Sequence, residues 1–139
     1  MIDATIYDDQ GTVLGCMSGT EEEIAAFTAG RTFIGGFYPR QDYYVLNGQP
    51  VRKPPSPGDN FIWSVQDQGW VFDPAVAERN ARFKRTNLLK LTDWTQLPDV
   101  ADTIRQAWGT YRQALRDVSD QSGFPQTIVW PEPPYPLDY

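Results

Sequence analysis

The segment from residue 102 to residue 118 reads DTIRQAWGTYRQALRDV. Its apolar side chains recur at positions i, +3, +4, +7, +11 and +14, which is the spacing of one face of an α-helix. They are Ile104, Ala107, Trp108, Tyr111, Leu115 and Val118. The sequence therefore predicts an amphipathic helix that begins near Asp99 or Asp102 and ends near Val118.

A second helix is predicted just before this one, over about 74–91. Asp73 is a favourable N-cap, and Pro74 stands at the first helical position, where its missing N–H removes no helical hydrogen bond. The apolar stripe of this helix consists of Ala77, Ala81, Leu88 and Leu91. Residues 92–98 are predicted as a loop, because Pro98 disfavours helical backbone at the residue before it. Two helices joined by a short loop form a helical hairpin.

Residues 123–139 contain five prolines and are predicted to form an extended C-terminal tail. Large aromatic side chains are frequent in the helices and this tail, and two helices alone cannot bury them all. Either the tail folds back over the helices or a partner covers them, and for Trp108 and Tyr111 we expect the tail. For the segment 130–134, WPEPP, two interpretations stay open: a docked tail, or a preformed proline-rich ligand for an aromatic groove.

Residues 1–73 read as a β-rich module. Short β-favouring runs alternate with turns, among which Asn47-Gly48 is the strongest hairpin signal. Thr20–Glu23 matches a capping box that opens a short helix to about residue 29, with Gly30 as its C-cap. Strands are predicted over 4–8, 12–17, 32–38, 42–46, 50–53, 61–66 and 69–73.

The predicted fold class is therefore α+β. Residues 1–73 form a small N-terminal module of hairpins plus one short helix, and residues 74–139 form an α-helical hairpin with an extended Pro-rich C-terminal tail. A proline-rich connector, residues 54–58, lies within the first module and lacks the donors of a central strand.

The charge of the chain is uneven. The 139 residues carry 18 acids and 12 bases, a net charge of −6, and residues 1–73 account for all of it. This acidic balance argues against general nucleic-acid binding, which needs surplus Lys and Arg. Residues 79–116, however, hold eight bases and three acids. They could form a patch for an acidic partner, but two solvated helix faces are the favoured interpretation.

Arg112 and Arg116 stand one helical turn apart within this basic segment. They could point together at one acidic site on a partner. They could equally bond Asp93, Asp99 or the tail of the same chain.

Catalytic and metal-binding interpretations find little support. The chain contains no His, which removes the commonest general base and transition-metal ligand. The single Cys16 excludes an intrachain disulfide and is predicted to be a small apolar side chain within a strand. Asp3, Asp8 and Asp9 match no calcium loop and favour an exposed turn. We therefore predict no enzyme activity, no catalytic residue, no metal and no cofactor.

No N-terminal leader pattern and no apolar stretch of membrane-spanning length is present in the sequence. We therefore expect a soluble protein of a reducing compartment, without a membrane span.

An ordered set of short motifs covers residues 80–134, about 40% of the chain. They are Arg85–Leu89, Thr92–Asp99, Trp108, Tyr111–Asp117, Gly123–Pro125, and Trp130-Pro131 followed by Pro133-Pro134. In this order they resemble the C-terminal domain of phage tail assembly chaperone and tail fibre assembly proteins. Residues 42–48, 54–55, 61–63 and 70–71 are more loosely similar to a β-rich module of short phage tail proteins.

This resemblance implies a non-enzymatic phage tail fibre assembly chaperone. Such a protein binds a tail fibre or receptor-binding protein, through that partner's C-terminal region, and assists its folding, trimerisation or attachment. The alternative is a structural virion component that decorates the tail fibre tip or the baseplate. The expected location is the host cell cytoplasm during assembly, or the virion tail if the protein is retained there.

Eight residues are the candidates for contact with the partner. They are Trp94, Trp108, Tyr111, Arg112, Arg116, Phe124, Trp130 and Pro131. Each offers either a large aromatic or apolar surface or a guanidinium group, the groups that anchor protein interfaces.

Overall fold

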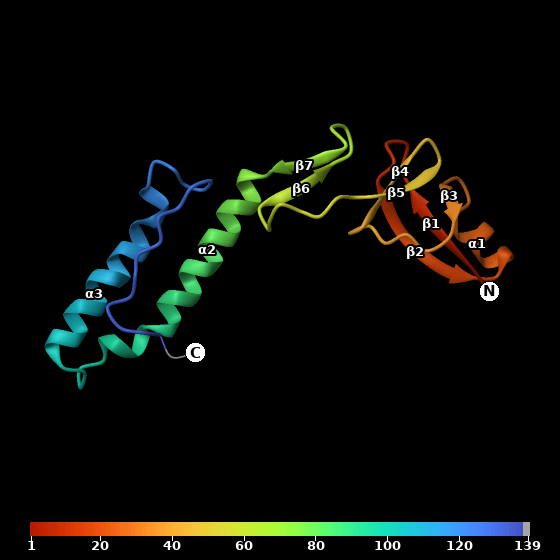
Figure 1. Cartoon of the computed structure of the whole chain (residues 1–139). Helices are drawn as coiled ribbons and strands as arrows, with labels where there is room; N and C mark the ends of the chain where they lie inside the picture. The colour runs from red at the N-terminus through yellow and green to blue at the C-terminus, as the bar shows by residue number, and fades with distance from the viewer. Residues whose placement is uncertain (138–139) are drawn as a thin grey trace. The chain divides into compact units, whose positions relative to one another are not determined.

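The computed structural model describes residues 1–137 of the chain. Contacts divide the chain into two compact units, Met1–Val71 and Phe72–Tyr139. Strands make up most of the regular structure of the first unit and helices that of the second, as Figure 1 shows. The predicted α+β class is confirmed.

A three-stranded antiparallel sheet opens the first unit. It contains β1 (Ile2–Tyr7), β2 (Val13–Gly19) and β3 (Thr32–Gly35) in the order β2-β1-β3. The Asp8 carboxylate accepts hydrogen bonds from the backbone N–H groups of Gln10 and Thr12, at 3.0 and 2.8 Å. Asp8 therefore closes the β1–β2 turn, as the sequence favoured.

The short helix α1 (Glu21–Phe27) begins with the predicted capping box. Thr20 accepts from the Glu23 backbone, and the Glu23 carboxylate accepts from the Thr20 backbone. The prediction of Gly30 as the C-cap is wrong, because the helix ends at Phe27 with Thr28 as its cap. The Thr28 hydroxyl donates to the Ile24 carbonyl at 2.7 Å, so a carbonyl of the last turn is hydrogen-bonded at Thr28, two residues before the predicted cap.

Two hairpins complete the strands of the chain. The first pairs β4 (Tyr43–Leu46) with β5 (Gln49–Arg52), and the second pairs β6 (Phe61–Ser64) with β7 (Gly69–Phe72). Asn47 and Gly48 both have positive φ, 52° and 75°, as the predicted Asn-Gly turn requires. The predicted strand over 32–38 is too long, because the chain leaves the sheet at Gly36, whose φ is 107°.

The second unit is built on two long helices, α2 (Pro74–Leu91) and α3 (Asp102–Arg116). The Asp73 carboxylate caps α2 as predicted and accepts from the N–H of Ala75 at 2.8 Å. The predicted loop over 92–98 is in fact partly helical, since a 3₁₀ turn, η1 (Asp93–Gln96), lies within it. A second 3₁₀ turn, η2 (Asp117–Asp120), continues α3.

The core of the second unit forms where the tail meets both helices. Trp108, Tyr111 and Leu115 of α3 are buried there. Leu88, Leu89, Ile104, Trp130 and Leu137 pack against them. The tail, dark blue in Figure 1, therefore folds back over the helices, as predicted for Trp108 and Tyr111. Leu91 does not belong to the buried stripe of α2, because its side chain is 47% exposed.

Candidate functional site

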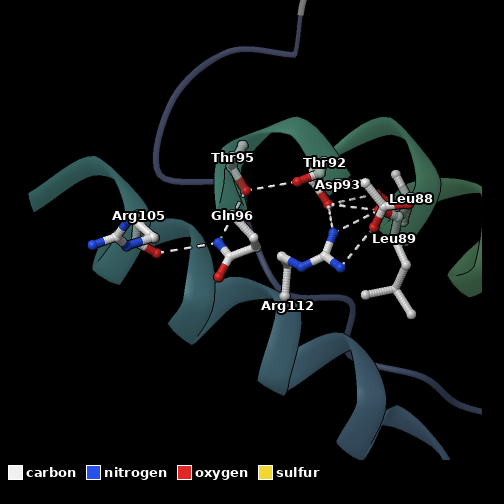
Figure 2. A network of polar contacts seen from close by, with 8 residues as sticks. All are labelled: Leu88, Leu89, Thr92, Asp93, Thr95, Gln96, Arg105 and Arg112. Atoms are coloured by element: carbon white, nitrogen blue, oxygen red, sulfur yellow. Dashed lines mark hydrogen bonds and ion pairs between the residues drawn. The ribbon is translucent and has the colours of Figure 1, made fainter. Parts of the chain in front are cut away.

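Arg112 is the centre of a polar network between the end of α2 and the middle of α3 (Figure 2). Its Nη1 donates to the Leu89 carbonyl at 2.6 Å and to the Thr92 hydroxyl at 2.8 Å. Its Nη2 lies 2.7 Å from the Asp93 carboxylate. The guanidinium thus adds a donor to the Leu89 carbonyl, which also accepts from the N–H and hydroxyl of Thr92 at the end of α2. A positive charge at this helix C-terminus is also favoured by the helix dipole.

The network continues through the 3₁₀ turn to the start of α3. The Thr95 hydroxyl donates to the Thr92 carbonyl at 2.6 Å, and Thr92 and Thr95 are fully buried. The Gln96 amide donates to the Thr95 hydroxyl and to the Arg105 carbonyl, at 3.1 and 3.2 Å. Figure 2 shows Gln96 pointing toward the Arg105 carbonyl of α3, and Arg112 pointing from α3 toward the end of α2. The 3₁₀ turn is therefore held by hydrogen bonds of Asp93, Thr95 and Gln96, and Trp94 lies between these residues in the turn.

Trp94 is exposed over 54% of its surface although it lies beside the core. Its ring centroid is 6.4 Å from that of Trp108, which is 2% exposed. A small pocket of about 120 Å³, here called the Trp94 pocket, lies at this point. Its lining consists of Leu91, Trp94, Trp108, Pro136 and Leu137.

Further apolar side chains of the same segments are exposed. Leu91 is 47% exposed and Leu97, just after the 3₁₀ turn, is 51% exposed. Tyr135 of the tail is 52% exposed, and its ring centroid lies 6.3 Å from that of Trp108. An exposed Trp with aliphatic and tyrosine neighbours is a suitable anchor for a protein partner.

The structure divides the eight predicted contact residues into several groups. Trp108, Tyr111 and Arg112 are buried, and Trp130 packs against the core with the Lys84 ammonium 4.4 Å from its ring centroid. Phe124 and Pro131 are half-buried, and Trp94 and Arg116 are exposed. Arg112 is bonded to Asp93, which is one of the intrachain partners that the sequence left open for Arg112 and Arg116. Contact of these eight residues with a partner remains a prediction.

Leu91, Leu97 and Tyr135 were not among the predicted contact residues. Helical periodicity assigned Leu91 to the buried stripe. Leu91 is the last residue of α2, however, and its side chain is 47% exposed. Tyr135 follows three prolines within five residues, and nothing in that pattern places it beside Trp108.

Among residues 1–137, no group of three or more acidic, Cys or His side chains could hold a metal ion. No helix in the described part of the chain is both long and apolar enough to cross a membrane. The pKa of Lys53 in the first unit is below its ordinary value, chiefly because its ammonium is partly buried and also because Arg40 is near.

Neither the curated proteins nor the solved structures contain a match to this chain. A protein-family model matches residues 78–135, which span α2 from its second turn, η1, α3, η2 and most of the tail. The match includes the Arg112 network and all but two residues of the Trp94 pocket, Pro136 and Leu137. The family that this model describes is the phage tail assembly chaperone protein, so residues 78–135 are similar to the family that their motifs resemble.

Proposed function

We propose that the protein is a phage tail fibre assembly chaperone. It binds a tail fibre or receptor-binding protein and assists its folding, trimerisation or attachment. The observation that carries this proposal is the exposed Trp94 beside an apolar pocket, within the part of the chain that matches the chaperone family. A chaperone needs such a surface, because it must hold apolar groups that its client has not yet buried.

The Trp94 pocket suits an apolar side chain from a β-rich client. Its volume of about 120 Å³ accepts one aliphatic or proline side chain rather than a large ligand. Elongated trimeric fibres form slow, non-local strand pairs and expose strand edges until they assemble. The family resemblance of residues 78–135 supports the further proposal that the client segment is the fibre's C-terminal region. The proposed work is contact without chemistry, in the host cytoplasm during assembly.

Co-expression with a candidate fibre protein tests this proposal. The wild-type chain should raise the yield of trimeric fibre and co-purify with it. Trp94→Ala should lower co-purification by about tenfold or more, since a Trp that anchors an interface costs about 2 kcal/mol or more of binding free energy when it is truncated. Phe83→Ala is the matched control, because Phe83 is an aromatic residue of α2 that is 70% exposed and does not line the pocket.

Three results would contradict the proposal. They are unchanged trimer yield with the wild-type chain, absence of co-purification, and equal loss of capture for Trp94→Ala and Phe83→Ala. Circular dichroism of both variants should match that of the wild type, since both side chains are more than half exposed.

A second candidate function is a structural component of the virion. It is favoured by the first unit, which lies outside the matched residues 78–135 and has a fold of its own. Mass spectrometry of purified virions separates the two roles. Stoichiometric amounts in particles support the structural role, and complete absence from particles rejects it.

A further inference from the structure

The first unit carries an open aromatic groove between its hairpins. Two adjoining pockets of about 570 and 610 Å³ form it, and they share Gln41, Lys53 and Trp70. We call these two pockets together the Lys53 groove. Its aromatic lining consists of Tyr43, Tyr44, Trp63 and Trp70.

The aromatic side of the groove is well ordered by its own contacts. The ring centroids of Tyr44 and Trp63 lie 5.0 Å apart, and those of Trp63 and Trp70 lie 5.4 Å apart in an edge-to-face arrangement. The Trp70 indole donates to the Pro54 carbonyl at 2.7 Å, which attaches the proline-rich connector to the same wall. The Trp63 indole N–H is buried without a hydrogen-bond partner among the described residues. A ligand oxygen that reached it would satisfy this donor.

The positive charges of the first unit are concentrated on this groove. Residues 1–71 contain nine acids but only four bases, and three of these bases, Arg40, Arg52 and Lys53, line the groove. The fourth base, Arg31, does not line it. Asp42 is the only acid in the lining, and no ion pair forms at the three cations within residues 1–137. A local positive surface on an acidic unit indicates an anionic partner.

Lys53 stands at the junction of the two pockets. Its ammonium lies 5.5 Å from the Trp63 ring centroid and 5.9 Å from that of Trp70, and it donates to the Arg40 carbonyl at 2.7 Å. Partial burial and the nearby Arg40 charge lower the pKa of Lys53, while Asp42 opposes this shift. A bound carboxylate would favour the charged form of Lys53 and so oppose the lowering of its pKa.

We propose that the Lys53 groove binds an acidic, extended peptide segment of a partner protein. The lining combines aromatic and aliphatic side chains, including Val13, Ile62 and Val65, with the three cations. A segment that alternates apolar and acidic residues complements both parts, whereas a uniformly charged polymer leaves the apolar part unused. Two adjoining pockets also fit an extended chain better than a single small anion. This binding does not depend on the function proposed for the second unit.

Titration of the full-length chain with two capped peptides tests the proposal. The probe is Ac-Glu-Val-Pro-Glu-Val-Pro-Glu-NH₂, and its neutral counterpart carries Gln in place of each Glu. Isothermal calorimetry gives the affinity, and tryptophan fluorescence reports on the site. We expect the acidic peptide to bind at least tenfold more tightly than the neutral one, and to weaken as salt is raised.

Single substitutions locate the site. Lys53→Met retains the aliphatic stem and should weaken binding of the acidic peptide about tenfold. Arg52→Gln should weaken it as well, and because Arg52 is exposed on β5 it provides a variant that does not depend on the packing around Lys53. Arg31→Gln removes the one base of the unit outside the groove and should change the affinity by less than about twofold.

Several outcomes would overturn the proposal. They are equal binding of the two peptides, an affinity that is the same for the wild type, Lys53→Met and Arg52→Gln, and an equal loss for Arg31→Gln. Tighter binding of an oligogalacturonate of similar charge than of the acidic peptide would assign the groove to acidic saccharides instead.

Discussion

Arg112 shows how one side chain can hold two elements of the fold together. Arg112 is 8% exposed. Its guanidinium donates three hydrogen bonds, which reach α2 and the turn that follows it. The basic composition of residues 79–116 made it a candidate for partner contact. Sequence alone could not distinguish that role, because the carbonyl and carboxylate that it meets are 19 to 23 residues away in the chain.

Replacing Arg112 by Met should destabilise the second unit by about 2 kcal/mol, because the Leu89 carbonyl and the buried Thr92 hydroxyl each lose one donor and Asp93 loses its counter-ion. Chemical denaturation followed by circular dichroism measures the effect. Arg116→Met is the matched control, since Arg116 is exposed one turn further along the same helix, and it should change the stability by less than about 0.5 kcal/mol. Equal stability of the two variants would contradict the view that Arg112 stabilises the contact between α2 and α3.

At the level of elements, local signals predicted most of what forms. The capping box of α1, the Asn47-Gly48 turn and the Asp73 cap of α2 each depend on residues within four positions of one another, so the sequence displays them directly. The predictions that were wrong concern segments whose structure depends on contacts with residues far away in the sequence. The strand that begins at Thr32 ends at Gly35, because Gly36 has a positive φ and its carbonyl accepts from the Thr5 hydroxyl of β1. The predicted loop after α2 folds into a 3₁₀ turn, from which the Gln96 amide donates to the Arg105 carbonyl of α3.

The turn between β1 and β2 depends on such a distant contact at Gly11. Its φ is +89°, its carbonyl accepts from the Val45 N–H at 2.8 Å, and a Cβ built there would lie 1.9 Å from the Val45 carbonyl oxygen. Gly11→Ala should therefore destabilise the first unit by more than about 2 kcal/mol. Thermal unfolding and hydrogen exchange of the Val45 amide measure this.

Gly15→Ala serves as the control for Gly11→Ala. Gly15 lies in β2, and a Cβ at this position would meet no atom within 4 Å. We expect a change of less than about 0.5 kcal/mol. Comparable losses for the two variants would mean that the close approach of Gly11 to Val45 is not what holds the turn.

On the scale of the whole molecule, the sequence predicted the fold class and the family of residues 78–135. It named Trp94 and Trp108 as contact candidates but did not predict the pocket that they line, and it did not predict the Lys53 groove. The Trp94 pocket is formed by residues up to 46 positions apart, and the Lys53 groove unites residues from 12 to 70. Periodicity and motifs report on neighbours in the chain, whereas a pocket depends on where separate segments meet.

The two proposed surfaces share no residue, so a change in one should leave the other intact. Trp94→Ala, which should weaken capture of the fibre, should bind the acidic peptide with an affinity within about twofold of the wild type. Calorimetry of the full-length variant measures this. A parallel loss of peptide affinity would show that the two surfaces are coupled.

The position of Trp130 and Leu137 in the core of the second unit has a consequence for synthesis on the ribosome. The first unit has all its residues once position 71 is made, but the second cannot cover Trp108 until position 137 has been added. At ordinary translation rates, adding the 29 residues between Trp108 and Leu137 takes about 1.5 to 6 s. During this time the aromatic residues of the helices stay uncovered, so the nascent chain itself passes through a stage in which it needs protection from aggregation.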